Sequence, residues 1–353
     1  MRVLELRRVS LPLVAPFATA HGVTTERDVL LVRAIRDDGV EGWGECAAPA
    51  EPTYTSEYVD GAHALLREYA WALDTVKGHP MAKAAVEAAV LDAELRATGT
   101  ALREHLGGTR DRVVAGVAIG AAHDVGALVG EVHRRVDEGY RRVKLKVMPG
   151  WDVEPVAAVR REFGDELLLQ VDANGSYAGE DTSALRALDD FGLLLIEQPL
   201  TDDDLDGHAT LATRLRTPIC LDESITSAMV AAHAIDAGAC RVVNVKPGRV
   251  GGLAEAKRVH DVCVERGADA WVGGMLETGV GRATILALAS LPGFTLPGDV
   301  SASDRWYERD LTPPFVLDPA DGTIAVPTSP VDPIPEMLDE VTVSCERLER
   351  PQR

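Results

Sequence analysis

The stretch RRVKLKV, residues 141–147, decides how the larger part of this chain is interpreted. It predicts a β-strand, because apolar residues alternate with Lys144 and Lys146. Side chains two residues apart on a strand share a face, so the two lysines point the same way between apolar neighbours. Two like charges aimed together need an explanation from the surrounding sequence.

Similar apolar runs alternate with helical stretches from about residue 113 onward. Eight runs predict strands: VVAGVAIG, RVKLKV, LLLQVDAN, LLLIEQPL, PICLDES, RVVNVKPG, DAWVGG and FTLPGD. Helical segments such as WDVEPVAAVRREFG and GLAEAKRVHDVCVERG lie between them. Eight strands separated by helices favour a (β/α) barrel over an open doubly wound sheet, although the two architectures share much of this pattern.

The first hundred residues have a different, α+β pattern. MRVLELRRVSLPL and DVLLVRAIRDDGVEGWGECA predict an antiparallel meander with a turn at residues 37–39. MAKAAVEAAVLDAELRATG predicts a helix of strong helix formers that ends at Gly99. The alanine-rich face of this helix predicts close packing.

Length and composition exclude several classes of protein. The 353 residues are 46% hydrophobic and carry a net charge of −20. They can bury a large core, and so acidic a chain argues against nucleic-acid and anionic-membrane partners. Five scattered cysteines without a C-x-x-C motif favour reduced thiols in the cytoplasm. We expect no signal peptide, because the start MRVLELRRVSLPL has no continuous apolar stretch, and no membrane-spanning helix, because no apolar run approaches about 20 residues.

Five ionisable residues end consecutive apolar runs in the second part of the chain. Successive members are 26, 25, 25 and 24 residues apart: Lys146, Asp172, Glu197, Asp222 and Lys246. A near-constant step of one βα unit places equivalent points of neighbouring strands side by side. Because the C-terminal strand ends of a barrel face one cavity, we expect these five side chains to converge there.

Three carboxylates in one cavity indicate a metal site. Asp172, Glu197 and Asp222 would raise one another's pKa unless a cation joined them. A single acid at a strand end is usually a helix cap or a solvated side chain, but that explanation fits three consecutive strands poorly. Oxygen ligands suit Mg²⁺ or Mn²⁺. No histidine or cysteine cluster suggests zinc, and His208 and His233 are predicted to lie on helix surfaces.

The lysines add acid–base chemistry to this site. In a closed ring Lys146 and Lys246 lie on opposite sides of the acids, and the charge of Lys144 would lower the pKa of Lys146. One lysine can then remove the proton next to a substrate carboxylate, a cation stabilises the enediolate, and the other lysine returns a proton or supports the charge. A metal-free Schiff-base aldolase is a weaker alternative, because it gives the three acids no task. A non-catalytic protein of the same fold is weaker still.

Several motifs resemble the enolase superfamily, in its muconate-lactonizing branch: VKLKV, VDAN, IEQPL, LDES, NVKPGRVGG and GGMLETGVGRA. With PLVAPF, EGWGEC, GHPMAKAAVEAAVLDAELRA and TLPGDVSASDR, the chain is most similar to the group of o-succinylbenzoate synthases and N-acylamino acid (N-succinylamino acid) racemases. The resemblance implies an α/β fold: a modified TIM barrel, (β/α)7β, with an N-terminal α+β capping domain. It places the cap in residues 1–108, the barrel in 109–318, and a segment returning to the cap in 319–353. A mobile capping loop is expected at residues 16–22.

The resemblance also implies roles for individual residues. The metal ligands would be Asp172, Glu197 and Asp222, holding Mg²⁺ or another divalent ion such as Mn²⁺. The acid–base pair would be Lys146 and Lys246. The supporting residues would be Lys144, which orients the substrate carboxylate, Asn174 and Glu223 behind the metal ligands, and Arg249 behind Lys246.

The implied activity is that of an o-succinylbenzoate synthase, which dehydrates 2-succinyl-6-hydroxy-2,4-cyclohexadiene-1-carboxylate in menaquinone biosynthesis. Racemisation of N-acyl or N-succinyl amino acids is the alternative, and both activities can share one site. The implied partners are a small carboxylate substrate and further copies of the chain, without nucleic acid or membrane. Two departures concern the cap: the segment from Leu66 to Lys77 is short, and VPTSPVDPIP lacks a glycine-rich turn.

Overall fold

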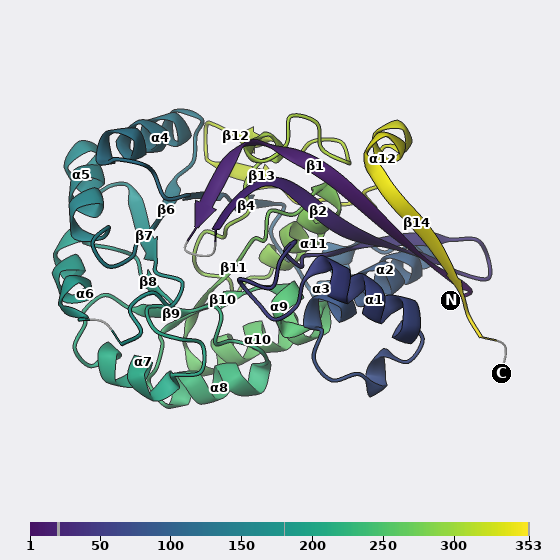
Figure 1. The fold of residues 1–353 in the computed structure, drawn as a ribbon, viewed down its shortest axis with the longest axis horizontal. Coiled ribbons are helices and arrows are strands. Elements are labelled where there is room, and N and C mark those ends of the chain that lie inside the picture. Colours follow the sequence, from purple (N-terminus) through teal and green to yellow (C-terminus); the bar gives the residue numbers. More distant parts are fainter. Residues whose placement is uncertain (20–21, 180, 352–353) are drawn as a thin grey trace.

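The computed structural model describes residues 1–19, 22–179 and 181–351. An antiparallel cap lies beside a barrel of strands and helices, and the C-terminal segment runs from one to the other (Figure 1). None of the helices in the described ranges is long and apolar enough to cross a membrane.

The cap is built on a four-stranded antiparallel sheet in the order β14-β1-β2-β3. Its strands are β1 (Val3–Thr19), β2 (Gly22–Ile35), β3 (Glu41–Cys46) and β14 (Thr342–Glu349). The predicted turn at residues 37–39 joins β2 to β3, which confirms the meander. The capping segment predicted at residues 16–22 is strand rather than loop at residues 16–19 and 22, and its mobility stays a prediction. After an irregularity in the register, Phe17 pairs with Thr24 and Thr19 with Gly22, so the ladder continues. Residues 20 and 21 lie outside the described ranges.

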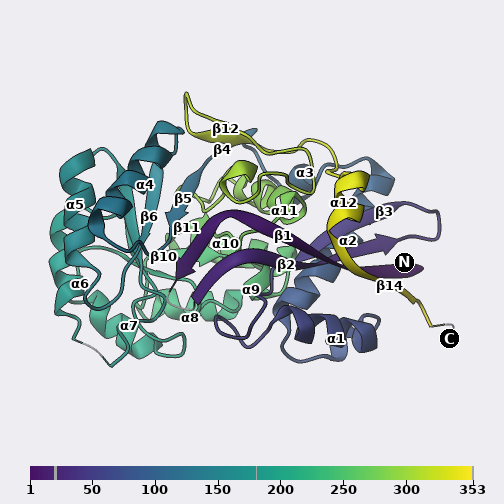
Figure 2. The same ribbon diagram turned by 45° about the horizontal axis from the view of Figure 1, so that its top comes forward.

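The tip of this long hairpin reaches the barrel. Figure 2 shows β1 and β2 curving from the cap across the barrel strands. The amide of Ala121, which follows β5, donates a 2.9 Å hydrogen bond to the carbonyl oxygen of Ala18. The cap therefore covers one end of the barrel through β1 and β2.

The helices of the cap are α1 (Val59–Tyr69), α2 (Pro80–Thr98) and α3 (Leu102–Leu106), with the short 3-10 helix η1 (Leu73–Thr75). The alanine-rich face of α2 packs directly on β3. A Cβ atom on Gly44 would overlap the backbone of Ala85 and Ala89. This confirms the predicted close packing. Helix α2 also ends as predicted at Gly99, whose left-handed backbone (φ 68°) suits glycine.

Seven parallel strands of the described residues form the barrel sheet in sequential order. They are β5 (Gly116–Ile119), β6 (Arg142–Lys146), β7 (Leu168–Asp172), β8 (Ile196–Glu197), β9 (Ile219–Leu221), β10 (Val242–Val245) and β11 (Asp269–Val272). The helices that follow them are α4 (Val125–Asp137), α5 (Val153–Phe163), α6 (Ser183–Ala187), α7 (Leu205–Ala212), α8 (Ala228–Asp236), α9 (Pro247–Val250), α10 (Leu253–Arg266) and α11 (Gly279–Ala289). The 3-10 helices η2 (Leu188–Phe191) and η3 (Ser303–Arg305) complete this part. The (β/α)7β prediction is confirmed in this arrangement.

The eighth predicted strand, FTLPGD, forms no regular strand. Its amides at Thr295 and Asp299 donate to the carbonyls of Ala270 and Val272 in β11, at 3.0 and 2.9 Å. Gly298 forms a parallel bridge with Ala115, next to β5. The segment thus closes the ring, but Pro297 lacks an N–H group and cannot continue a ladder.

The alternation in RRVKLKV sorts side chains between two environments. Val143 and Leu145 are buried in the cluster that joins the strands to the outer helices. Lys144 lies inside the barrel, with its Nζ 4.9 Å from the ring centre of Trp271. The predicted common face of Lys144 and Lys146 is therefore the inner face.

The C-terminal segment contacts the barrel before it reaches the cap. A small sheet with the order β12-β13-β4 joins β4 (Arg112–Val114), β12 (Leu317–Asp318) and β13 (Thr323–Ala325). Helix α12 (Pro335–Val341) then leads into β14, which pairs antiparallel with β1.

Candidate active site

The five ionisable residues converge at one end of the barrel. Strands β6, β7 and β8 end at Lys146, Asp172 and Glu197, and Asp222 and Lys246 directly follow β9 and β10. Lys146 is in register with Asp172, and Asp172 with Glu197. The spacing of one βα unit therefore predicted their placement correctly.

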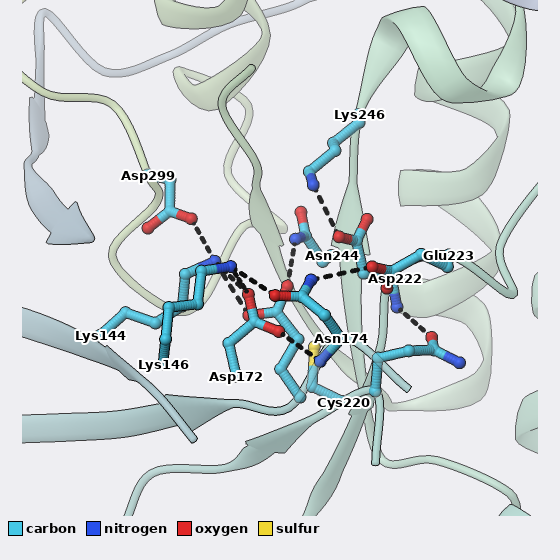
Figure 3. A network of polar contacts seen from close by, with 12 residues as sticks. Lys144, Lys146, Asp172, Asn174, Cys220, Asp222, Glu223, Asn244, Lys246 and Asp299 are labelled. Carbon is cyan, nitrogen blue, oxygen red and sulfur yellow. Dashed lines mark hydrogen bonds and ion pairs between the residues drawn. The ribbon is translucent and has the colours of Figure 1, made fainter. Parts of the chain in front are cut away.

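Each catalytic lysine candidate meets a different carboxylate. Lys146 Nζ lies 2.7 Å from Asp172 Oδ2, and Lys246 Nζ lies 2.6 Å from Asp222 Oδ2. Figure 3 shows Lys246 approaching the acids from the side away from Lys146. Asp172, Glu197 and Asp222 are at most 2% exposed, so these ion pairs form in a nearly water-free setting.

Lys144 is surrounded by carboxylates rather than left as a free charge. Its Nζ lies 2.5 Å from Asp299 Oδ2, 3.0 Å from Glu197 Oε2 and 3.3 Å from Asp172 Oδ2. Burial alone would lower the pKa of Lys144, but these three carboxylates raise it well above the ordinary value. Three acids compensate the charge of Lys144 in this arrangement, and its tuning of Lys146 by repulsion stays a prediction.

Asp299 escaped the sequence analysis. It is the last residue of the irregular eighth segment, FTLPGD, and its Oδ1 accepts a 2.5 Å hydrogen bond from Arg142 Nη1. Arg142 is fully buried inside the barrel and also donates to the carbonyl of Pro297. The only sequence signal for Asp299 was its position in the motif TLPGDVSASDR, at the end of the last apolar run.

Lys246 lies in a second network, which includes a residue of the cap. The hydroxyl of Tyr54, on the loop after β3, donates to Asp222 Oδ2 at 3.1 Å and accepts from Lys246 Nζ at 3.0 Å. Burial alone would lower the pKa of Lys246, but Asp222 and Tyr54 raise it above the ordinary value. Tyr54 lies in a loop without periodicity, so no sequence pattern pointed to it.

Arg249 lies beside Asp222, close to its predicted place. Its Nε is 3.3 Å from Asp222 Oδ1, and its Nη2 donates to the hydroxyl of Tyr54. It therefore shares both partners of Lys246 and fixes Asp222 from a second direction.

Amide side chains support the acids. Asn174 accepts a 2.7 Å hydrogen bond from Lys146 Nζ and donates a 2.9 Å bond to Glu223 Oε1. Asn244 Nδ2, which the sequence analysis missed, donates to Glu197 Oε1 at 2.7 Å. Asn174 and Gln198 have left-handed backbones, with φ of 44° and 38°. Such conformations are unfavourable outside glycine and concentrate at functional sites.

The carboxylates have the chemistry of a site for a hard divalent cation. Burial and the charge of Asp172 raise the pKa of Glu197 to about 8, and burial and Asp222 raise that of Glu223 to about 7. Oδ1 of Asp222 and Oε2 of Glu223 are buried without a hydrogen-bond donor. Among the residues that the structure describes, no three His, Cys, Asp or Glu side chains form a group that could hold a metal as they stand. The oxygen donors fit Mg²⁺, but at present they pair with lysines.

His208 and His233 lie outside this site. His233 is exposed on α8, as predicted. The prediction for His208 is wrong, because α7 turns this residue toward the barrel and buries it completely. Its Nε2 accepts a 3.2 Å hydrogen bond from the amide of Leu200. His208 is therefore a structural contact between a helix and a loop.

A cavity of about 400 Å³ opens above the acids, between the barrel and the cap. Its size suits a small organic substrate. Side chains from both parts line it, among them Phe17, Arg27, Tyr54, Lys146, Lys246 and Trp306.

Comparisons with known proteins agree with this geometry. Residues 2–107 match the family model described as mandelate racemase / muconate lactonizing enzyme, N-terminal domain, and residues 127–330 match the enolase C-terminal domain-like model. An N-succinylamino acid racemase from Amycolatopsis sp. is 56% identical over 360 aligned residues, which cover 97% of each chain. An o-succinylbenzoate synthase from Geobacillus stearothermophilus is 45% identical over 341 residues, 92% of this chain and 90% of the relative. The crystal structure of an enolase superfamily member from Listeria innocua superposes with a TM-score of 0.93 at 37% identity, covering 99% of this chain and 98% of that one.

Proposed function

Because this chain belongs to the enolase superfamily, in its mandelate racemase and muconate lactonizing branch, we propose that it acts as an o-succinylbenzoate synthase. The reaction removes the proton next to the carboxylate of 2-succinyl-6-hydroxy-2,4-cyclohexadiene-1-carboxylate and expels its hydroxyl group as water, leaving an aromatic ring. One observation carries this proposal: Lys146 and Lys246 reach the buried acids from different sides (Figure 3). The product would serve menaquinone biosynthesis.

Asp172, Glu197 and Asp222 would hold a divalent cation, for which Mg²⁺ is our proposal. When bound, the cation supplies positive charge that stabilises negative charge on the substrate's carboxylate. The acids now paired with Lys146 and Lys246 would turn toward the cation, which frees the lysines for the substrate.

The lysines then have separate tasks. Lys146 takes the proton from the carbon next to the carboxylate and gives a proton to the departing hydroxyl group on the same face. Lys246 keeps its proton and faces the growing negative charge from the other side. Asn174 and Tyr54 accept hydrogen bonds from Lys146 and Lys246, so each lysine keeps a neutral partner when the acids turn to the cation, while Arg249 stays beside Asp222.

A second activity, racemisation of N-succinyl amino acids, has its own support. With a lysine on each side of the substrate, one can remove a proton and the other can return one to the opposite face. The relative at 56% identity is named as such a racemase. We propose that both reactions use this one site.

Turnover by the purified protein tests the proposal. We expect Mg²⁺-dependent conversion of both substrates, its loss in a chelator, and its loss in Lys146→Ala. If the protein converts neither substrate, or is fully active without divalent cations, the proposal is refuted. Trapping of a lysine adduct by borohydride would instead support the Schiff-base alternative.

We also propose a cytoplasmic enzyme that acts on a small carboxylate, without nucleic-acid or membrane partners, and assembles from identical subunits. The net charge of −20 supports the absence of nucleic-acid partners. Met229 on α8 and Val264 on α10 are large, exposed apolar side chains on packed neighbouring helices, where a second copy could bind. Sedimentation of the purified chain as a monomer at micromolar concentration would contradict the assembly.

A further inference from the structure

We propose that Arg27 binds the second carboxylate of the substrate, the one at the far end of a succinyl group. This inference rests on the proposed function and adds the residue that selects a dianionic substrate. Arg27 lies on β2 two residues before Val29, on the same face of the strand. Val29 packs with Trp306 and Tyr307 of the barrel side, so Arg27 faces the end of the barrel rather than solvent.

Arg27 is a buried cation with almost no partners. The residue is 5% exposed, and its side chain lines the cavity. Its Nε and Nη2 have no hydrogen-bond partner, and Nη1 makes only a 3.5 Å contact with the carbonyl of Ala48. Leaving such donors unsatisfied away from water costs free energy, which a ligand could recover.

The nearby carboxylate of Glu45 does not serve as the missing partner. Its Oε1 accepts a 3.1 Å hydrogen bond from the amide of Thr278. Its Oε2 accepts from Thr278 Oγ1 at 2.6 Å and from the amide of Gly281 at 2.9 Å. Glu45 thus binds the start of α11 and forms no ion pair with Arg27.

The other cations that line the cavity in the described ranges are already engaged. Lys144, Lys146 and Lys246 each pair with carboxylates, as described above. The two terminal nitrogens of Arg282 donate to the carbonyls of Ser301 and Glu277. Among these cations Arg27 alone lacks both a carboxylate and a hydrogen bond shorter than 3.5 Å.

The succinyl group supplies the anion that this position lacks. The names of the Amycolatopsis and Geobacillus relatives both contain the succinyl group. A succinyl group ends in a carboxylate of its own, in addition to the carboxylate next to the reacting carbon. A guanidinium can bind a carboxylate through two parallel hydrogen bonds. Because Nε and Nη2 are shielded from water, the guanidinium would turn toward the cavity as the carboxylate enters. One end of the substrate would then lie at the barrel lysines and the other at the cap.

A pair of matched substrates tests this inference. N-succinylalanine carries the distal carboxylate, while N-succinamoylalanine replaces it by a neutral amide of the same shape. We expect wild-type kcat/KM to favour the first, and Arg27→Gln to reduce this preference about 10- to 100-fold, mainly through KM. Arg27→Lys should keep part of the preference. Arg33→Gln is the control, because Arg33 lies on the same strand but pairs with Glu41 outside the cavity.

Equal wild-type kcat/KM for the two compounds would overturn the inference, whether or not Arg27→Gln folds. An equal loss for both compounds in Arg27→Gln would also overturn it, because it would show a purely structural role. Calorimetric binding of the same compounds with Mg²⁺ separates this inference from the proposed function. Tighter binding of the dianion, lost in Arg27→Gln, upholds the subsite even if neither compound turns over. Turnover of both compounds without preference upholds the function and refutes the subsite.

Discussion

Asp299→Asn should strongly destabilise the barrel, although Asp299 lies in an irregular segment. The carboxylate of Asp299 lies 2.5 Å from both Arg142 Nη1 and Lys144 Nζ. The side chains of these two cations are 0% and 4% exposed. Asparagine keeps the size of the side chain but removes its charge, so two buried cations lose the anion they share.

The size of the effect follows from the partners that remain. Removing one member of a buried ion pair costs about 3–5 kcal/mol. Lys144 keeps Glu197 at 3.0 Å and Asp172 at 3.3 Å, and Arg142 keeps the carbonyl of Pro297. We therefore expect the lower end, about 3 kcal/mol. For a chain of 353 residues, this corresponds to a fall in Tm of roughly 4 °C.

Thermal unfolding followed by circular dichroism at pH 7 measures this change. Asp339→Asn is the control: it removes a similar ion pair, 3.2 Å from Arg7, but its carboxylate is 80% exposed. The control should cost less than about 1 kcal/mol. A fall in Tm no larger for Asp299→Asn than for Asp339→Asn would refute the reasoning.

The same pair of proteins also gives a pH test. Burial alone would raise the pKa of Asp299, but Lys144 and Arg142 lower it below the usual range. A carboxyl whose pKa is lower in the folded state stabilises the fold above its unfolded pKa of about 4, and loses this effect as the pH falls further. The gap between wild type and Asp299→Asn should stay constant from pH 8 to 5 and narrow below about pH 4.

Three further predictions follow from other contacts. Gly44→Ala should prevent folding or lower Tm by more than about 10 °C, because the added Cβ would overlap the backbone of Ala85. Gly130→Ala is the control: its Cβ would meet open space, so Tm should stay unchanged or rise. Similar Tm values for the two variants would contradict the packing of α2 on β3. Tyr54→Phe should lower kcat about 10-fold with little change in KM, because it removes the hydroxyl that contacts Lys246, Asp222 and Arg249. An unchanged kcat in steady-state assays would count against a role of this hydroxyl in positioning Lys246. Burial raises the pKa of Glu45 to about 7, above its unfolded value, so wild-type stability should fall as the pH rises from about 4.5 to 7. Glu45→Gln should show a smaller fall in Tm over this range, and identical slopes would disprove the assignment.

The sequence could predict those parts of the site that repeat with the βα unit. Lys146, Asp172 and Glu197 end neighbouring parallel strands, so their spacing alone was enough to place them together. The alternation in RRVKLKV likewise fixed the inner face for Lys144. These features are local or periodic, which is why a pattern of residues could carry them.

What the sequence could not predict depends on contacts between distant segments. Tyr54 comes from a cap loop, and Asp299 ends a segment that forms no regular strand, so neither side chain is placed by a regular βα repeat. The compensation of Lys144 by three acids is a tertiary arrangement that sequence spacing does not describe. His208 was placed on a helix correctly, but its burial depends on which face of α7 meets the barrel.

Exchange of the α-proton of N-succinylalanine in D₂O tests the central claim, that two lysines act on a substrate from opposite faces. With Mg²⁺, we predict that the wild type exchanges this proton in both enantiomers. Lys146→Ala should exchange it in one enantiomer only, and Lys246→Ala only in the other. If both variants exchange the same enantiomer, or each still exchanges both, the account of this site is wrong.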